Sequence, residues 1–206
     1  MSIVGRFAFA TLCALVLASI AHVGAILLLP FVSQQDALSR LQPVRVDGEA
    51  VLLSGPETRG WSTHHDPATA LSACAYDLSE APLRVTFGTG AHFQSASFHS
   101  RGSGVYFTLT DRAVEGTQMD VLIMTPEQRF EDEARRAASA DAEDRAPTVR
   151  AQDPLAGVIR VTAPEPQGFV AFRVLAPLPG LAETATERAL SARCTPFPLN
   201  DTDTAS

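Results

Sequence analysis

The sequence predicts a mainly β protein in which a single N-terminal transmembrane helix is followed by a β-sandwich-like domain with a C-terminal helix. Three observations predict this order: an uncharged apolar run at residues 7–32, short β-compatible runs across residues 66–175, and a helical pattern at residues 181–194. We divide the chain into a short cytoplasmic tail (1–6), a transmembrane helix (7–32), a juxtamembrane connector with short strands (33–65), the sandwich domain (66–196) and a polar tail (197–206).

The apolar run at residues 7–32 is long enough to cross a bilayer. As a helix it would reach about 39 Å, against ~30 Å for the hydrocarbon core of a membrane. A cleavable signal peptide has a shorter apolar core followed by small residues, whereas this run ends in Leu29, Pro30 and Phe31. We therefore favour an uncleaved anchor, with the lipid bilayer as its partner, over a cleaved signal peptide or a buried helix of a soluble core.

Composition excludes several classes of function. The net charge of −7 leaves no basic field for nucleic acid. All 16 positive residues are arginine, which excludes lysine-based Schiff-base chemistry and a P-loop. With the alanine excess, the missing lysine indicates a GC-rich bacterial genome.

The cysteines indicate the compartment. Cys13 lies in the span, which leaves Cys74 and Cys194 as a pair in the domain. Such a pair in a bacterial periplasm usually forms a disulfide, so we predict a Cys74–Cys194 bridge, with two buried thiols as the alternative. Arginines near both ends of the span leave its orientation close to a tie by charge. The cysteine pair favours a single-pass protein of the bacterial inner membrane with its domain in the periplasm.

Two early segments allow more than one interpretation. Residues 33–41 either continue the helix or form a turn, and residues 44–54 alternate as a short strand pair. Residues 71–78 fit a helix that starts at Asp66-Pro67, since aspartate caps helices and proline favours their first position. The same residues also fit a strand.

A period of two between residues 68 and 111 predicts strands at residues 82–87, 91–100 and 105–110. Short β-compatible runs predict further strands at residues 120–124, 156–162 and 168–175. Glycine and proline separate them, with a hairpin turn expected at residues 101–104. Short strands at this spacing favour a β-sandwich or partial barrel.

Two segments depart from the strand pattern. Residues 127–145 are charged and rich in alanine, with i,i+4 ion pairs in the favourable order, and predict an exposed helix or excursion that reaches residue 150. Residues 181–194 predict a helix in which Leu190 and Cys194 share the inner face and which Pro196 ends.

Standard catalytic and metal-binding motifs such as HExxH, CxxC and GxGxxG do not occur. We therefore expect no metal and no cofactor. His64, His65 and Asp66 lie in a polar loop, where adjacent side chains point in different directions. His92 and His99 would face opposite sides of an unbroken strand.

Polar side chains near the predicted strand ends form the candidate ligand-binding cluster. Its members are Tyr76, Asp77, Arg84, Arg101, Asp111 and Arg112. Strand ends build binding mouths in sandwiches, and they also build ion pairs that fix turns. We assign none of these residues a catalytic role.

Several short motifs carry a family resemblance. They are Asp66-Pro67, CAYDL at residues 74–78, PLRV at 82–85, Asp111-Arg112, IRVTAP at 159–164 and FRVL at 172–175. Across residues 66–194, with a gap over 127–150, the chain resembles the bacterial proteins grouped as domain of unknown function 1254, in particular their small membrane-anchored branch. The resemblance implies a β-sandwich in the cell envelope, beside a companion protein of a related uncharacterised family, and no established activity. Phe93, Val105 and Thr110 depart from the Trp and Asn residues of that pattern.

Three hypotheses of function follow. The domain binds a partner protein or an envelope ligand. Alternatively, the chain is an envelope enzyme, or a subunit of one, that acts on a small anionic or sugar-like ligand through Asp77, Asp111 and nearby arginines. In the third hypothesis the chain is an anchor or assembly factor that packs through residues 7–32.

Overall fold

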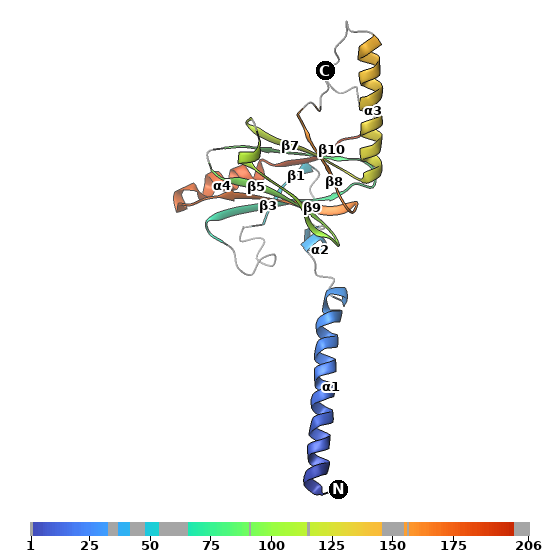
Figure 1. Ribbon diagram of the computed structural model, residues 1–206. Helices are drawn as coiled ribbons and strands as arrows, with labels where there is room; N and C mark the ends of the chain where they lie inside the picture. The colour runs from blue at the N-terminus through green and yellow to red at the C-terminus, as the bar shows by residue number, and fades with distance from the viewer. Residues whose placement is uncertain are drawn as a thin grey trace. The chain divides into compact units, whose positions relative to one another are not determined.

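The computed structural model describes residues 2–32, 37–41, 48–53, 66–90, 92–114, 116–145, 155 and 157–199. The chain divides into two compact units, Met1–Ser39 and Arg40–Ser206, and each is described on its own (Figure 1). Residues 33–36, the predicted strand residues 44–46, and His64 and His65 lie outside the described residues.

One long helix, α1 (Ile3–Val32), dominates the first unit. By length and composition its stretch Ile3–Leu29 is able to cross a membrane. Apolar side chains are exposed on all sides of α1, and a helix of that kind needs lipid or a protein core around it. The hydroxyls of Thr11 and Ser19 each donate to the carbonyl oxygen four residues earlier, a bond that would satisfy these hydroxyls in a membrane.

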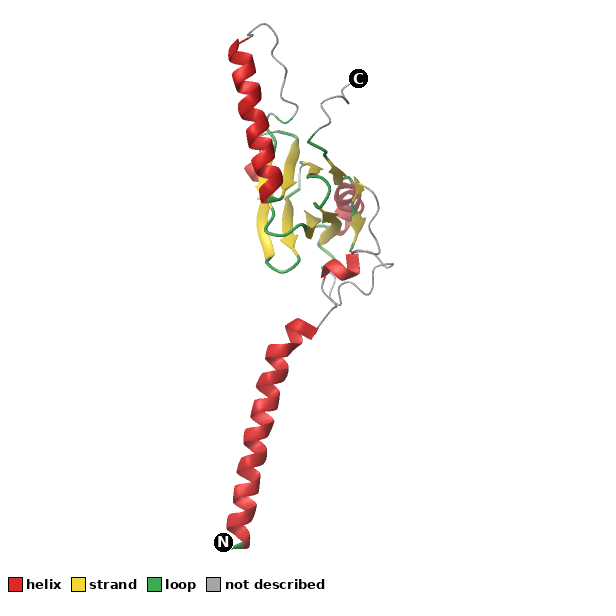
Figure 2. Ribbon diagram, turned by 90° about the vertical axis from the view of Figure 1, so that its right-hand side faces the viewer, coloured by secondary structure: helices red, strands yellow, loops and turns green. Residues whose placement is uncertain are grey.

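The second unit is a sandwich of two five-stranded sheets (Figures 1 and 2). Sheet A has the order β1 (Gly48–Glu49), β10 (Arg193–Pro196), β4 (Leu83–Gly88), β7 (Gln118–Met124) and β8 (Ile159–Thr162). Sheet B has the order β2 (Val51–Leu52), β3 (Thr69–Asp77), β9 (Gln167–Leu175), β5 (Gln94–Ser100) and β6 (Gly104–Thr110). The predicted fold class, an apolar helix followed by a β-sandwich and a C-terminal helix, is therefore confirmed.

The pairs of described strands are antiparallel except β7 and β8, which run parallel. Parallel neighbours need a long crossover, and the segment that contains α3 (Pro126–Arg145) supplies it. The predicted charged helix is present; it begins beside the sheets and projects beyond the sandwich (Figure 2). It starts at a reciprocal cap, in which the Gln128 amide N–H donates to Thr125 Oγ1 and the Thr125 amide N–H donates to Gln128 Oε1.

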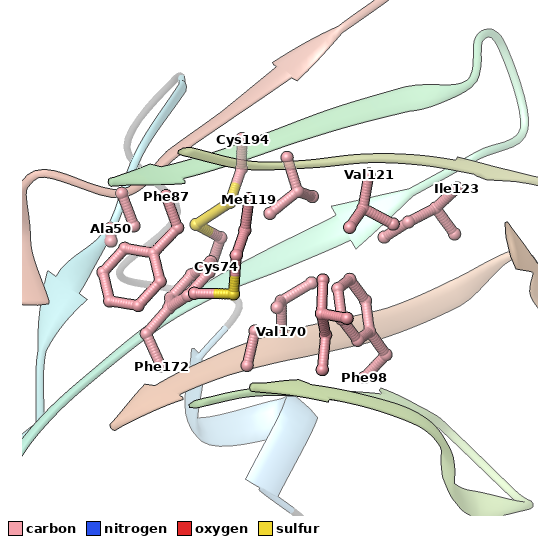
Figure 3. Close-up of a cluster of buried hydrophobic side chains, with 14 of the residues drawn as sticks. Ala50, Cys74, Phe87, Phe98, Met119, Val121, Ile123, Val170, Phe172 and Cys194 are labelled. Atoms are coloured by element: carbon pink, nitrogen blue, oxygen red, sulfur yellow. A yellow bond between two sulfur atoms is a disulfide. The ribbon is translucent and has the colours of Figure 1, made fainter. Parts of the chain in front are cut away.

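Inward-facing residues of both sheets form the main core. β4 alternates between buried and half-buried positions along its whole length, as a strand with one face on a core requires. Phe87 of sheet A and Phe172 of sheet B meet in the centre with ring centroids 5.0 Å apart. Beside them the predicted disulfide joins Cys74 to Cys194, with Cα atoms 6.5 Å apart (Figure 3). The disulfide therefore links the two sheets to each other.

The C-terminal helix is shorter than predicted. A 3₁₀ turn at Pro179–Leu181 leads into α4 (Ala182–Leu190), and Arg193–Pro196 forms strand β10. The prediction that Cys194 lies on the inner face of this helix is wrong, because Cys194 is a strand residue and Leu190 is 38% exposed. The buried face consists of Ala185 and Ala189, whose small side chains let α4 pack closely against β3 and β9.

Pro196 does not end a helix but occupies the last position of β10. The Phe197 amide donates to the Pro82 carbonyl on the β4 side. Backbone groups of successive residues face alternate sides of a strand, so the backbone nitrogen of Pro196 faces away from β4. Proline lacks an N–H and is tolerated in a strand where no ladder bond is needed. This position explains why a proline sits inside a strand.

For residues 71–78 the structure decides between the two alternatives in favour of a strand, β3. Asp66 starts no helix. Its carboxylate accepts hydrogen bonds from the Ala68 amide and the Thr69 hydroxyl, which forms a turn that leads into β3. Cys74 then faces the core, as the strand alternative requires.

Candidate functional site: a cavity between two sheet edges

Of the predicted polar cluster, Tyr76, Asp77 and Arg101 lie at the same end of sheet B. Gln167 connects two of them, because its Nε2 donates to Asp77 Oδ2 and its Oε1 accepts from Arg101 Nη1, each over 3.0 Å. Gln167 pairs with Asp77 across β3 and β9, and Arg101 lies in the β5–β6 turn. These bonds fix a turn to two strands. The sequence prediction did not include Gln167. The signal that could have found it is a polar residue directly after Pro166, where strand β9 begins.

Arg84 lies apart from that group, on the outer face of sheet A. Its Nε and Nη2 donate to the two carboxylate oxygens of Asp120 over 3.0 and 2.6 Å. The hydrogen bond to Asp120 raises the pKa of Arg84, and burial opposes it. The forked geometry joins β4 to β7 and leaves Arg84 occupied in a structural ion pair.

Asp111 and Arg112 lie at the far end of the β5–β6 hairpin. They begin the 3₁₀ turn Asp111–Ala113 directly after β6, whereas Arg101 precedes β6. Seven strand residues span about 20 Å, so the structure does not bring Asp111 near Arg101.

Tyr76 points into the sandwich, where its hydroxyl donates to the His99 carbonyl and lies 2.9 Å from the hydroxyl of Tyr106. A bulge in the β5–β6 pairing turns Tyr106 inward beside Phe107. Burial raises the pKa of Tyr76 to about 12 and that of Tyr106 still further, so both hydroxyls stay neutral. A Cβ on Gly168 would collide with the His99 carbonyl and the Tyr76 hydroxyl, so this close approach requires glycine.

His99 lies on the outer face of sheet B. Its ring stacks on Phe169 with centroids 4.4 Å apart, and its Nε2 lies 3.0 Å from Ser97 Oγ. Burial first, and Arg173 second, lower the pKa of His99. In the part of the chain that the structure describes, no hydrogen bond joins a carboxylate to this ring, and no cluster of three His, Cys, Asp or Glu side chains is placed to hold a metal ion. His99 therefore lacks the third group of a catalytic triad.

A cavity of about 530 Å³ lies at the edge of the sandwich. It opens where the chain crosses from sheet A to sheet B between β1 and β2, with Ala50 buried at the crossover. Its walls are Leu41, Gly48, Glu49, Val51, residues 73–77, residues 79–81, Leu83 and residues 194–196. The Cys74–Cys194 disulfide is part of the wall. We call this hollow the edge cavity.

The acidic side chains of the edge cavity are Glu49, Asp77 and Glu80, and no basic residue belongs to its described lining. Asp77 Oδ1 accepts from the amide and hydroxyl of Ser79, and Glu49 lies 3.7 Å from Arg193. Glu80 is exposed and has no ion pair among the described residues. Of the three, Glu80 therefore presents an exposed negative charge at the cavity. Only Tyr76 and Asp77 of the predicted cluster belong to its lining.

Comparisons with known proteins establish the fold only. No protein-family model matches the chain, and no curated protein matches its sequence. The VPA0106 protein from Vibrio parahaemolyticus has a similar structure, with a TM-score of 0.50, 10% identity, and coverage of 78% of this chain and 34% of that chain. An uncharacterized protein from Burkholderia cenocepacia matches with a TM-score of 0.42, 8% identity, and coverage of 73% and 35%. The chain thus spans about a third of the length of both proteins, and at this identity the likeness to the first shows a shared fold.

Proposed function

We propose that the protein is a single-pass protein of the bacterial inner membrane whose sandwich domain lies in the periplasm and binds a partner protein through the edge cavity. The observation that carries the binding proposal is the edge cavity itself. It combines about 530 Å³ of space, an acidic lining and a strand edge that β2 covers only in part.

Two features support the proposed address. α1 has the length and composition of a membrane span, and the domain contains a disulfide. Disulfides persist in oxidising compartments such as the periplasm and are rare in the cytosol. The resemblance to the small membrane-anchored branch of domain of unknown function 1254 agrees with this address and stays a prediction.

The enzyme alternative loses its support because its proposed residues are dispersed. Arg84 is paired with Asp120 on the outer face of sheet A, and Asp111 lies at the far end of β6 from Arg101. A single ligand would not contact all three. Binding of a partner at the edge cavity does not require these dispersed residues to come together.

Photo-crosslinking in native membranes tests the proposal. A photoreactive benzoyl-phenylalanine replaces Ala81, which lines the edge cavity, in the full-length chain. The matched control carries it at Ala182, an exposed alanine at the start of α4. We expect a polypeptide adduct on illumination from position 81 and none from position 182. Absence of a polypeptide adduct from position 81, or equal adducts from both positions, would refute partner binding at this cavity.

A further inference from the structure

We propose that the segment bound in the edge cavity is an extended stretch of the partner that adds as a strand beside Ala75 at the edge of β3 and places a lysine or arginine against the acidic lining. This inference rests on the proposed function and names the chemistry of the partner.

The hydrogen bonds of β3 show which of its residues face the edge. The Leu53 amide donates to the Leu71 carbonyl over 2.7 Å, on the β2 side, and the Leu78 amide donates to the Pro166 carbonyl over 2.9 Å, on the β9 side. Backbone groups of an antiparallel strand alternate between its two neighbours. Odd-numbered residues of β3 therefore direct their N–H and C=O away from β9.

β2 covers only the first part of that edge. Val51 pairs with Ala73, and the next edge-facing residue of β3 is Ala75. The chain that would continue β2 has crossed to sheet A by then, because Glu49 pairs with Arg193 of β10. Among the described residues, no strand lies opposite Ala75, so its backbone N–H and C=O are presented at the wall of the edge cavity.

The opposite wall of the cavity, formed by β10, offers fewer backbone hydrogen-bonding groups to an added strand. Cys194 already pairs with Gly48, and Pro196, which faces the same side, has no N–H to donate. An added strand therefore finds a donor and an acceptor at Ala75 and only a carbonyl at Pro196. We therefore infer that the added strand pairs with β3 and not with β10. Other domains bind extended peptides in the same way, by adding them to an exposed sheet edge.

The charge of the lining indicates which side chain the bound segment carries into the cavity. Glu49, Asp77 and Glu80 bring carboxylates to the lining, whose described part includes no basic residue, although Arg193 lies 3.7 Å from Glu49. Glu80 contributes an exposed charge free of an ion pair among the described residues. A basic side chain on the added strand would be attracted, whereas an acidic one would be repelled. Because Glu49 and Glu80 are exposed, the preference is expected to weaken with salt.

The test starts from the segment captured by the photoreactive group at position 81, which is sequenced by mass spectrometry and synthesised with a fluorescent label. Two further versions carry backbone N-methyl groups, one at the odd and one at the even positions of the segment. N-methylation removes donors from one edge of a strand and leaves every side chain in place, so each version controls the other. Binding is measured by fluorescence anisotropy to the full-length chain in lipid nanodiscs.

We expect one N-methylated version to bind about fivefold more weakly than the unmodified segment, since it loses the hydrogen bond that its N–H would donate to the Ala75 carbonyl. The other version should bind within about twofold. Glu80→Lys should weaken binding by about three- to tenfold, and the difference should shrink at high salt. Glu187→Lys, an exposed control on α4, should leave affinity unchanged.

Each contrary result has a definite meaning. Equal binding of the two N-methylated versions, a captured segment without lysine or arginine, or no effect of Glu80→Lys would overturn the inference while partner binding stood. A small molecule or lipid found in the cavity, with no polypeptide adduct from position 81, would overturn the inference and the proposed function together.

Discussion

The disulfide should supply a large part of the stability of the sandwich. Cys74 and Cys194 are 120 residues apart in the sequence and join β3 to β10, which belong to different sheets. In the chain-entropy model, closing a loop of this length stabilises the folded state by about 5 kcal/mol. Replacing both cysteines by alanine should lower the free energy of unfolding by about that amount, and the melting temperature by roughly 10–20 °C for a domain of this size.

Denaturant titration of the full-length chain in detergent micelles, followed by circular dichroism, measures this change. The matched control is Cys13→Ala, which removes the free cysteine of α1 and should leave the unfolding midpoint of the domain unchanged. The wild type in excess reductant should behave like the double variant. A loss below about 1 kcal/mol in the double variant would refute the claim that the bridge holds the two sheets together.

Three further predictions concern single residues of the domain. Gly168→Ala should destabilise the sandwich by about 3 kcal/mol, measured by the same titration, because the added Cβ collides with the His99 carbonyl; an unchanged midpoint would contradict the packing described. The folded state lowers the pKa of His99 through burial and then Arg173, so stability should fall as the pH drops below about 6.5, where the unfolded chain takes up a proton first. Between pH 8 and pH 5 the unfolding midpoint should change less with pH in His99→Gln than in the wild type. An equal pH dependence in both would show that His99 does not cause the loss of stability. Asp132→Ala should cost about 2–3 kcal/mol, because it leaves the nearly buried Arg160 without the carboxylate that lies 2.9 Å from its Nε; thermal melting that matched the wild type would show that this pair does not hold α3.

Much of the fold could be predicted because its signals are local. Uninterrupted apolar sequence identifies α1, alternation identifies β4, and a short apolar run identifies β7. The end of α4 could not be predicted in the same way. Residues 193–196 become a strand because β4 and β1 offer backbone partners on both sides, a tertiary effect that no helical spacing contains. The start of α3 did carry a local signal, the Thr125 to Gln128 capping box, which sequence reasoning passed over.

The candidate site was less predictable. Arg101, Asp111 and Arg112 lie next to strand ends, as expected, but whether they come together depends on which end of the hairpin each one occupies. Arg101 and Asp111 flank the same strand and so lie apart. The edge cavity arises because residues 48–52 leave one sheet for the other, and short strands of two residues give almost no periodic signal. Its acidic residues come from three separate segments and form no motif.

The compartment of the sandwich domain is the claim on which the disulfide and the periplasmic partner depend. Two carboxy-terminal fusions of the full-length chain, one to alkaline phosphatase and one to green fluorescent protein, measure it directly in bacterial cells. For a periplasmic domain we expect an active phosphatase fusion and a fluorescent-protein fusion that stays dark. The phosphatase needs an oxidising compartment to form its own disulfides. A fluorescent fusion beside an inactive phosphatase would place the domain in the cytosol and contradict the account.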